Sequence, residues 1–306
     1  MTGVWIRCLC LLMLLGAIAP GLRAAEDRHV LVLGRISDDP RAHYDQLKAL
    51  LDYVVPRMKD VGITEGRVLM ARDPQQMASY LRRGRVDWVT ETSATAVQLQ
   101  QRANARLLVL TERNGVSRYH TLFFTHRDSP LQRLQDLPGH SLALQSTAST
   151  SAYMVPMTTL LEHGLRPEIL LGPGDTPPPD RVGYVFARSE ANIAAWVHKR
   201  MVDAGAVSNL DWQDPQRVPE AFKPDLRILF RTEDYPRALE LVRADLPAPV
   251  EARLREVLLQ ASGDPEASPA LRQFFNTSRF IPLDDSMRQT LAELRDGVAR
   301  VRAEVE

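Results

Sequence analysis

Three consecutive hydroxyl residues, Ser149, Thr150 and Ser151, are the group whose types and spacing most directly suggest chemistry. They lie between a strand-like run at 141–144 and a helix-like run at 153–163. Hydroxyls at a helix start lie beside backbone N–H groups that lack an intrahelical acceptor and beside the positive end of the helix dipole, so together they can bind an oxyanion. Ser and Thr are also ordinary helix-capping residues. The spacing alone does not separate an anion site from a helix cap.

The elements that would position this block alternate between short apolar runs and helical patterns. Strands are predicted at 30–33, 67–70, 86–90 and 107–110, with helices at 44–58, 74–82 and 93–102 between them. After an extended segment at 119–126, a second series has strands at 141–144, 168–171 and 202–207, helices at 153–163 and 191–201, and an extended run at 226–230. Pro156 predicts a kink or a tightening near the start of the helix at 153–163. This alternation predicts an α/β fold whose sheets are mixed but mostly parallel, with helices on both faces.

The last third of the chain is predicted to be mainly helical, at 248–261, 269–275 and 286–305. In the last of these segments, Leu291, Leu294, Val298, Val301 and Val305 follow heptad spacing, which over two repeats is too short to indicate a coiled coil. We expect this face to pack on the protein's own body; a dimer interface is the alternative.

Polar residues follow several of the predicted strands, where α/β sheets bind ligands. Each cluster could consist of turn or cap residues alone, but four clusters at equivalent places in two successive units predict a cleft between two lobes. The clusters are Arg35 with Ser37, Glu91 with Thr92 and Ser93, the Ser149–Ser151 block, and Ser208 with Asn209.

The first 24 residues have the pattern of a cleavable export signal. Arg7 precedes an apolar run at 8–19, Pro20-Gly21 interrupts it, and Ala24 provides a small residue for cleavage. An uncleaved anchor is the alternative, although the run is short for a membrane span. Both cysteines lie inside this segment, so the mature chain would have no disulfide and no thiolate. Removing residues 1–24 takes away two of the 38 basic and none of the 38 acidic residues, and the resulting charge of −2 argues against a nucleic-acid partner.

No standard catalytic signature is present in the sequence. It has no HExxH motif, no phosphate loop and no nucleophile elbow, and its seven histidines are scattered. We therefore expect no catalytic residues, no metal site and no cofactor.

Several motifs together resemble one family, the PhnD-type solute-binding proteins of ABC transporters for phosphonate, phosphite and phosphate. The most specific is Ser149-Thr-Ser-Ala-Tyr-Met-Val-Pro156. The others, in chain order, are Gly84-Arg-Val-Asp-Trp88, Asp128-Ser-Pro130, Leu137-Pro-Gly139, Val202-Asp-Ala-Gly205, Arg231-Thr-Glu-Asp-Tyr-Pro236 and Phe280-Ile-Pro-Leu-Asp-Asp285. The resemblance covers nearly all of the mature chain.

The resemblance implies a type II periplasmic-binding-protein fold, with two α/β lobes joined by two crossings. Residues 25–121 and 232–306 would form lobe 1, and residues 122–231 would form lobe 2. The implied ligand-binding residues are Ser149, Thr150, Ser151, Glu91, Thr92, Arg35, Ser37, Tyr119, Glu190 and Asn209.

Two residues depart from the phosphonate-binding pattern. Glu91 aligns near an aromatic residue of the family, and Glu190 aligns near a histidine. Carboxylates oppose a dianion by charge repulsion. They could instead accept a proton from a monoprotonated oxyanion or pair with an amine of the ligand, and Glu91 could contact Arg35 and leave the pocket neutral.

The function implied by the resemblance is capture of a small phosphonate- or phosphate-like oxyanion in the periplasm for an ABC permease, by a protein that is a monomer and not an enzyme. The alternative is a periplasmic sensing module that feeds a membrane receptor or sensor kinase, with a different ligand. An enzyme on the same fold is a third class, which the absence of cysteine from the mature chain disfavours.

Overall fold

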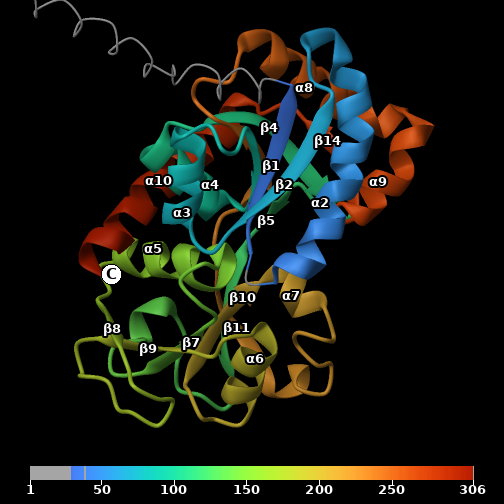
Figure 1. The fold of residues 1–306 in the computed structure, drawn as a ribbon. Helices are drawn as coiled ribbons and strands as arrows, with labels where there is room; N and C mark the ends of the chain where they lie inside the picture. Colours follow the sequence, from blue (N-terminus) through green and yellow to red (C-terminus); the bar gives the residue numbers. More distant parts are fainter. Residues whose placement is uncertain (1–28, 38, 306) are drawn as a thin grey trace, which may run out of the picture.

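The computed structural model describes residues 29–37 and 39–305, so the predicted export signal lies outside the described residues. Two six-stranded sheets dominate the fold, one in the upper and one in the lower half of Figure 1. The first has the order β14 (Thr277–Ile281), β4 (Arg106–Arg113), β13 (Leu239–Val242), β3 (Trp88–Glu91), β1 (Val30–Ile36) and β2 (Glu65–Ala71). The second has the order β11 (Leu226–Arg231), β6 (Thr121–His126), β10 (Ala204–Ser208), β7 (Ser141–Leu144), β9 (Val182–Phe186) and β8 (Pro167–Ile169).

Both sheets are mixed, as the sequence predicts. Of the pairings that the described strands make, two of five are parallel in the first sheet and three of five in the second, so the second sheet is mostly parallel and the first is not. The antiparallel share is larger because β13 and β14 return from the C-terminal third into the first sheet. The prediction that this third is mainly helical missed both strands.

The two chain crossings between the sheets lie side by side. On the first crossing, β5 (Arg118–Tyr119) leads into β6; on the second, β11 leads into β12 (Tyr235–Pro236). β5 pairs with β12 and β6 pairs with β11, both antiparallel. The two extended segments predicted at 119–126 and 226–230 are therefore one paired ribbon that joins the two halves.

Helices cover the first sheet on both faces. They are α2 (Pro40–Val54), the 3₁₀ segment η1 (Val55–Val61), α3 (Pro74–Arg82), α4 (Ser93–Ala103), α8 (Ala248–Gln260), η5 (Ala261–Gly263), η6 (Pro265–Ala267), α9 (Ser268–Gln273) and α10 (Asp285–Glu304). The second half carries η2 (Leu134–Asp136), η3 (Thr150–Met154), α5 (Val155–Glu162), α6 (Glu190–His198), α7 (Asn209–Gln213) and η4 (Lys223–Asp225). No helix of this described part is long and apolar enough to span a membrane.

The helix predicted at 153–163 begins three residues earlier, as a turn of π-helix. η3 contains a non-helical residue, Ala152 (φ −112°, ψ 19°), and α5 follows it. Pro156 lies in the first turn of α5, where its missing N–H leaves no hydrogen bond unmade. The distortion is at the predicted place, but the turn is widened rather than tightened.

The last helix, α10, packs on both halves of the molecule. It contacts α4 of the first half and α5 of the second, which Figure 1 shows as a helix running down to the level of α5. Its Leu291, Leu294, Val298 and Val301 are buried in one hydrophobic cluster that extends from α3 and α4 into α5 and β7. The prediction that this face packs on the protein's own body is confirmed.

Candidate ligand-binding site

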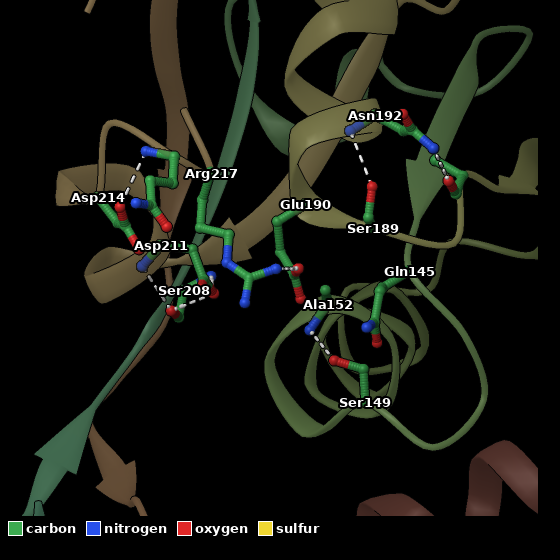
Figure 2. A network of polar contacts seen from close by, with 12 residues as sticks. Gln145, Ser149, Ala152, Ser189, Glu190, Asn192, Ser208, Asp211, Asp214 and Arg217 are labelled. Carbon is green, nitrogen blue, oxygen red and sulfur yellow. Dashed lines mark hydrogen bonds and ion pairs between the residues drawn. The ribbon is translucent and has the colours of Figure 1, made fainter. Parts of the chain in front are cut away.

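Three predicted site segments follow neighbouring strands of the second sheet. β7 lies parallel to both β9 and β10, so the residues after these strands meet at one edge. Ser149 follows β7, Glu190 follows β9 and Asn209 follows β10. Figure 2 shows Ser149, Ala152 and Gln145 beside Glu190, with Arg217 reaching toward the same carboxylate.

Ser149 is the N-cap of η3. Its Oγ accepts a hydrogen bond from the Ala152 N–H at 3.1 Å. This is the capping role that its residue type allows, and it occupies one N–H of the first turn. The N–H groups of Thr150 and Ser151 precede it, at the positions where a helix has no acceptor of its own.

Thr150 contacts the other half of the molecule. Its Oγ1 accepts from the Ala94 N–H at 3.1 Å and donates to Thr92 Oγ1 at 2.9 Å. Thr92 is the N-cap residue of α4 but makes no side-chain cap bond there. Thr150 therefore caps α4 from across the molecule, and the N-termini of η3 and α4 meet at this residue.

Ser151 joins the block to the crossing ribbon. The Ser151 carbonyl oxygen accepts from Thr121 Oγ1 at 2.8 Å, and the same hydroxyl lies 2.9 Å from the Tyr235 hydroxyl. The rings of Tyr119 and Tyr235 pack edge to face with centroids 4.6 Å apart. Burial raises the pKa of the Tyr119 phenol well above its ordinary value, and the hydrogen bond from Ser151 opposes this only in part. Tyr119 is thus a neutral hydrogen-bonding group within the ribbon.

Glu190 and Asn209 complete the second-sheet side. Glu190 Oε2 accepts from Arg217 Nη1 at 3.1 Å, and burial, with Asp211 nearby, raises the pKa of the Glu190 carboxyl. Asn209 Oδ1 accepts from the His120 N–H at 3.0 Å, so it fixes the start of α7 to the first crossing. Glu190 lies beside the Ser149 block, whereas the Asn209 side chain is engaged by the ribbon.

The first sheet presents the corresponding strand ends of β1, β3 and β4. β1 is parallel to β3, and β4 runs the same way because both β3 and β4 pair antiparallel with β13. Glu91, at the end of β3, is 5% exposed, and its Oε1 accepts from the Ile36 N–H at 2.6 Å. Burial raises the pKa of the Glu91 carboxyl, and Arg35 is the largest opposing influence. Glu91 therefore ties the end of β1 to β3 near Arg35, but it does not form the direct contact with Arg35 on which the neutral-pocket alternative depends.

In the same region, Arg35 lies near the end of β1 and Ser37 directly follows the strand. Arg35 is half-buried, and its guanidinium lies 4.5 Å from the centroid of the Phe275 ring. Ser37 is buried; its Oγ lies 2.6 Å from His43 Nδ1 and accepts from the Asp39 N–H at 3.0 Å. The Ser37 side chain therefore stabilises the turn that leads into α2.

Two buried charged residues of this region were missed by the sequence analysis. Glu240 is fully buried on β13 and accepts from Trp88 Nε1, Thr90 Oγ1 and Thr111 Oγ1 at 2.6, 2.8 and 2.6 Å. Burial raises the pKa of its carboxyl. Arg113 ends β4 and is 7% exposed; burial and the neighbouring Arg35 lower its pKa to about 9. A glutamate inside the apolar run 239–242 was the signal that could have indicated a buried polar network.

One hollow that the structure outlines lies away from this site. It measures about 370 Å³ and is lined by loops at 139–141, 173–177 and 200–203. These loops precede β7 and β10, so the hollow lies at the opposite edge of the second sheet from Ser149. The candidate site at the strand ends is defined by the polar groups that converge there. Among residues 29–37 and 39–305, no group of three potential ligands is placed to hold a metal ion.

Residues 36–287 match the family described as the periplasmic phosphonate substrate-binding protein of ABC transporters. The chain belongs to this family, which confirms the resemblance found in the sequence. The family consists of substrate-binding transport proteins of the periplasm that work with a small-molecule ligand and a membrane permease.

Solved structures agree with this assignment. The XAC2383 protein of Xanthomonas citri, solved with chloride, is 55% identical, with a TM-score of 0.86 over 90% of this chain and 100% of its own. Its structure with ATP gives 54% identity and a TM-score of 0.85 over 91% and 100%. PhnD1 of Prochlorococcus marinus, solved with methylphosphonate, is 17% identical, with a TM-score of 0.61 over 91% and 100%, and shares the fold. The two-lobe type II periplasmic-binding-protein fold is confirmed.

Proposed function

We propose that this chain captures a small phosphoryl-bearing anion between its lobes and presents it to an ABC permease, without chemical turnover. The lobes are proposed as 25–121 with 232–306 and 122–231, a division that follows the two sheets. Export with removal of residues 1–24 and a monomeric state are part of the proposal. The family match favours transport over a sensing role.

The observation that carries the proposal is the meeting of two helix N-termini at Thr150. η3 and α4 come from different lobes, and both direct the positive ends of their dipoles and first-turn N–H groups toward this point. Such a place stabilises negative charge without a lysine. XAC2383, more than half identical to this chain, has been solved with chloride and with ATP, both of them anions.

The remaining predicted site residues fit this proposal in different ways. Ser151 and Thr92 lie beside Thr150, and Glu190 with Arg217 lies beside Ser149. Arg35 supplies positive charge near Glu91 on the opposite lobe. Ser37, Tyr119 and Asn209 hold the surrounding turns and the ribbon, and we propose that they act by positioning.

A thermal-shift titration with methylphosphonate, phosphate, ATP and sulfate tests the proposal. A ligand at roughly a thousand times its Kd should stabilise the protein by about 4 kcal/mol. The variant Ser151→Ala combined with Thr150→Val should lose this response, whereas Ser262→Ala, an exposed residue of η5, should keep it. The proposal is wrong if none of the four anions shifts the melting temperature, and the site is misplaced if the double variant responds like the wild type.

A further inference from the structure

Two arginines of the first lobe pack on the same aromatic ring. The guanidinium carbons of Arg35 and Arg113 lie 4.5 and 4.3 Å from the centroid of Phe275. Arg113 is 7% exposed and Arg35 is half-buried. Stacking on an aromatic face favours each cation, but two like charges held on one ring repel each other.

The described groups in direct contact with the guanidinium groups of Arg35 and Arg113 are neutral and do not balance the two positive charges. Arg113 Nη2 donates to Thr90 Oγ1 at 3.1 Å, and Arg35 Nη1 makes a long contact of 3.4 Å with the Thr90 carbonyl oxygen. The Nε atoms of both arginines are buried without a hydrogen-bond partner. Within the described ranges, neither guanidinium has a carboxylate oxygen within the 4.0 Å of an ion pair, whereas buried charges are ordinarily paired.

The two nearest acids are already engaged elsewhere. Glu91 Oε1 accepts from the Ile36 backbone, and Glu240 accepts three hydrogen bonds from Trp88, Thr90 and Thr111. They lessen the positive field, but their bonded oxygens are directed at other donors. A buried donor without a partner costs about 1–3 kcal/mol, and more when it is charged. An anion bound at the accessible part of Arg35 would offset the repulsion between the two cations.

The pair lies at the edge of the first sheet that adjoins the second lobe. Arg35 and Arg113 end β1 and β4, which run in the same direction as β3, and β3 leads to Thr92 and its contact with Thr150. Arg35, the more exposed of the two, is the one placed to meet a ligand first, with Arg113 behind it.

We propose that Arg35 and Arg113 form a second anion subsite in lobe 1, so that the ligand carries two anionic groups. One phosphoryl group binds at Ser149–Ser151, and the other is held by the arginine pair. This inference rests on the proposed function. It narrows the proposed ligand class to molecules that carry two or more linked anionic groups, as polyphosphates do. A single phosphate fills only the first subsite.

Calorimetric titration with inorganic phosphate, pyrophosphate and tripolyphosphate at fixed ionic strength tests the subsite. In the wild type, the tighter of the two longer anions should bind at least about tenfold more tightly than phosphate, since tenfold corresponds to about 1.4 kcal/mol. Arg35→Gln should remove most of this gain, which is measured within each variant as the ratio of the phosphate Kd to the Kd of the longer anion. If the Arg113→Gln variant folds, it should also lose most of the affinity gain of the longer anions. If it does not fold, the result for Arg35→Gln alone tests the subsite.

Arg83→Gln is the matched control, because Arg83 is exposed at the C-terminus of α3 and its loss changes the net charge equally. It should keep the full gain. The subsite is overturned if the longer anions bind no better than phosphate, if Arg35→Gln keeps their advantage, or if Arg83→Gln loses it to the same extent. Failure of all three anions to bind the wild type would instead contradict the proposed function.

Discussion

The two lobes use equivalent strand ends for different chemistry. In lobe 1, the ends of β1, β3 and β4 and the neighbouring β13 carry Arg35, Glu91, Arg113 and Glu240, of which the last three are less than 10% exposed. In lobe 2, the ends of β7 and β9 carry hydroxyl groups and one ion pair, Glu190–Arg217, whose arginine side chain is 49% exposed. The comparison indicates that charge is fixed by the core in lobe 1 and can adjust to solvent and ligand in lobe 2.

Removing Glu240 should have the largest effect. Glu240→Ala leaves the donors on Trp88, Thr90 and Thr111 without an acceptor and removes an opposing charge from the surroundings of Arg113. We expect the free energy of unfolding to fall by about 3–5 kcal/mol, as measured by urea denaturation. The matched lobe 2 change, Glu190→Ala, should cost less than about 1 kcal/mol because it breaks one partly exposed pair. Equal losses would show that the lobes do not differ in this way.

Thr150→Val should have an intermediate effect. The substitution keeps the shape of the side chain but removes the cap of α4 and the bond to Thr92. Loss of a cap costs about 1 kcal/mol. Because both residues share one bond, Thr150→Val and Thr92→Val together should cost less than the sum of the two single changes. Strict additivity in thermal denaturation would contradict the direct contact between the lobes.

Glu190→Gln should have the smallest effect, visible in its pH dependence. Because the pKa of Glu190 is raised in the folded state, the folded protein holds this proton more tightly than the unfolded chain. The protonated Glu190 carboxyl therefore stabilises the folded state fully at a pH below 4.5, the ordinary pKa of a glutamate. This stabilisation is lost as the pH rises through the pKa that Glu190 has in the folded state. Relative to the wild type, Glu190→Gln should gain stability between pH 4 and pH 7 in urea denaturation. A difference that is constant with pH, or that falls, would show that the carboxylate is not desolvated.

The sequence predicts most of the framework because alternating apolar periodicity is local. The segments near β1, α3, α4 and β7 are found within a few residues of their observed bounds. β13 and β9 were missed: β13 is four residues long and includes Glu240, and β9 follows a proline-rich loop. Strands of this length acquire their stability from sheet neighbours distant in sequence, so local composition does not reveal them.

The sequence predicted where the hydroxyl block lies, but not which hydrogen bonds the site residues make. The Ser149–Ser151 block does lie at a helix start, as its residue types indicate. That Thr150 caps α4 depends on how the lobes approach each other, and that Glu91 binds the Ile36 N–H depends on the register of β1 against β3. The carboxylate that departed from the family pattern is thus part of a strand junction. Arg113 was not predicted as a site residue, because nothing in the neighbouring sequence indicates that it packs on the same Phe275 ring as Arg35.

The packing of α10 has a consequence for the energetics of ligand capture. Gly297 of α10 lies so close to α5 that a Cβ atom there would come within 2.2 Å of Thr158 Cγ2. Because α10 contacts both α4 and α5, separating the lobes would have to draw α10 away from one of these helices and would expose apolar side chains such as Leu294 and Val298 to water. This cost favours the observed arrangement of the two lobes before any ligand binds. A ligand that binds this arrangement therefore loses little binding free energy to rearrangement of the lobes, and its apparent Kd approaches the intrinsic value.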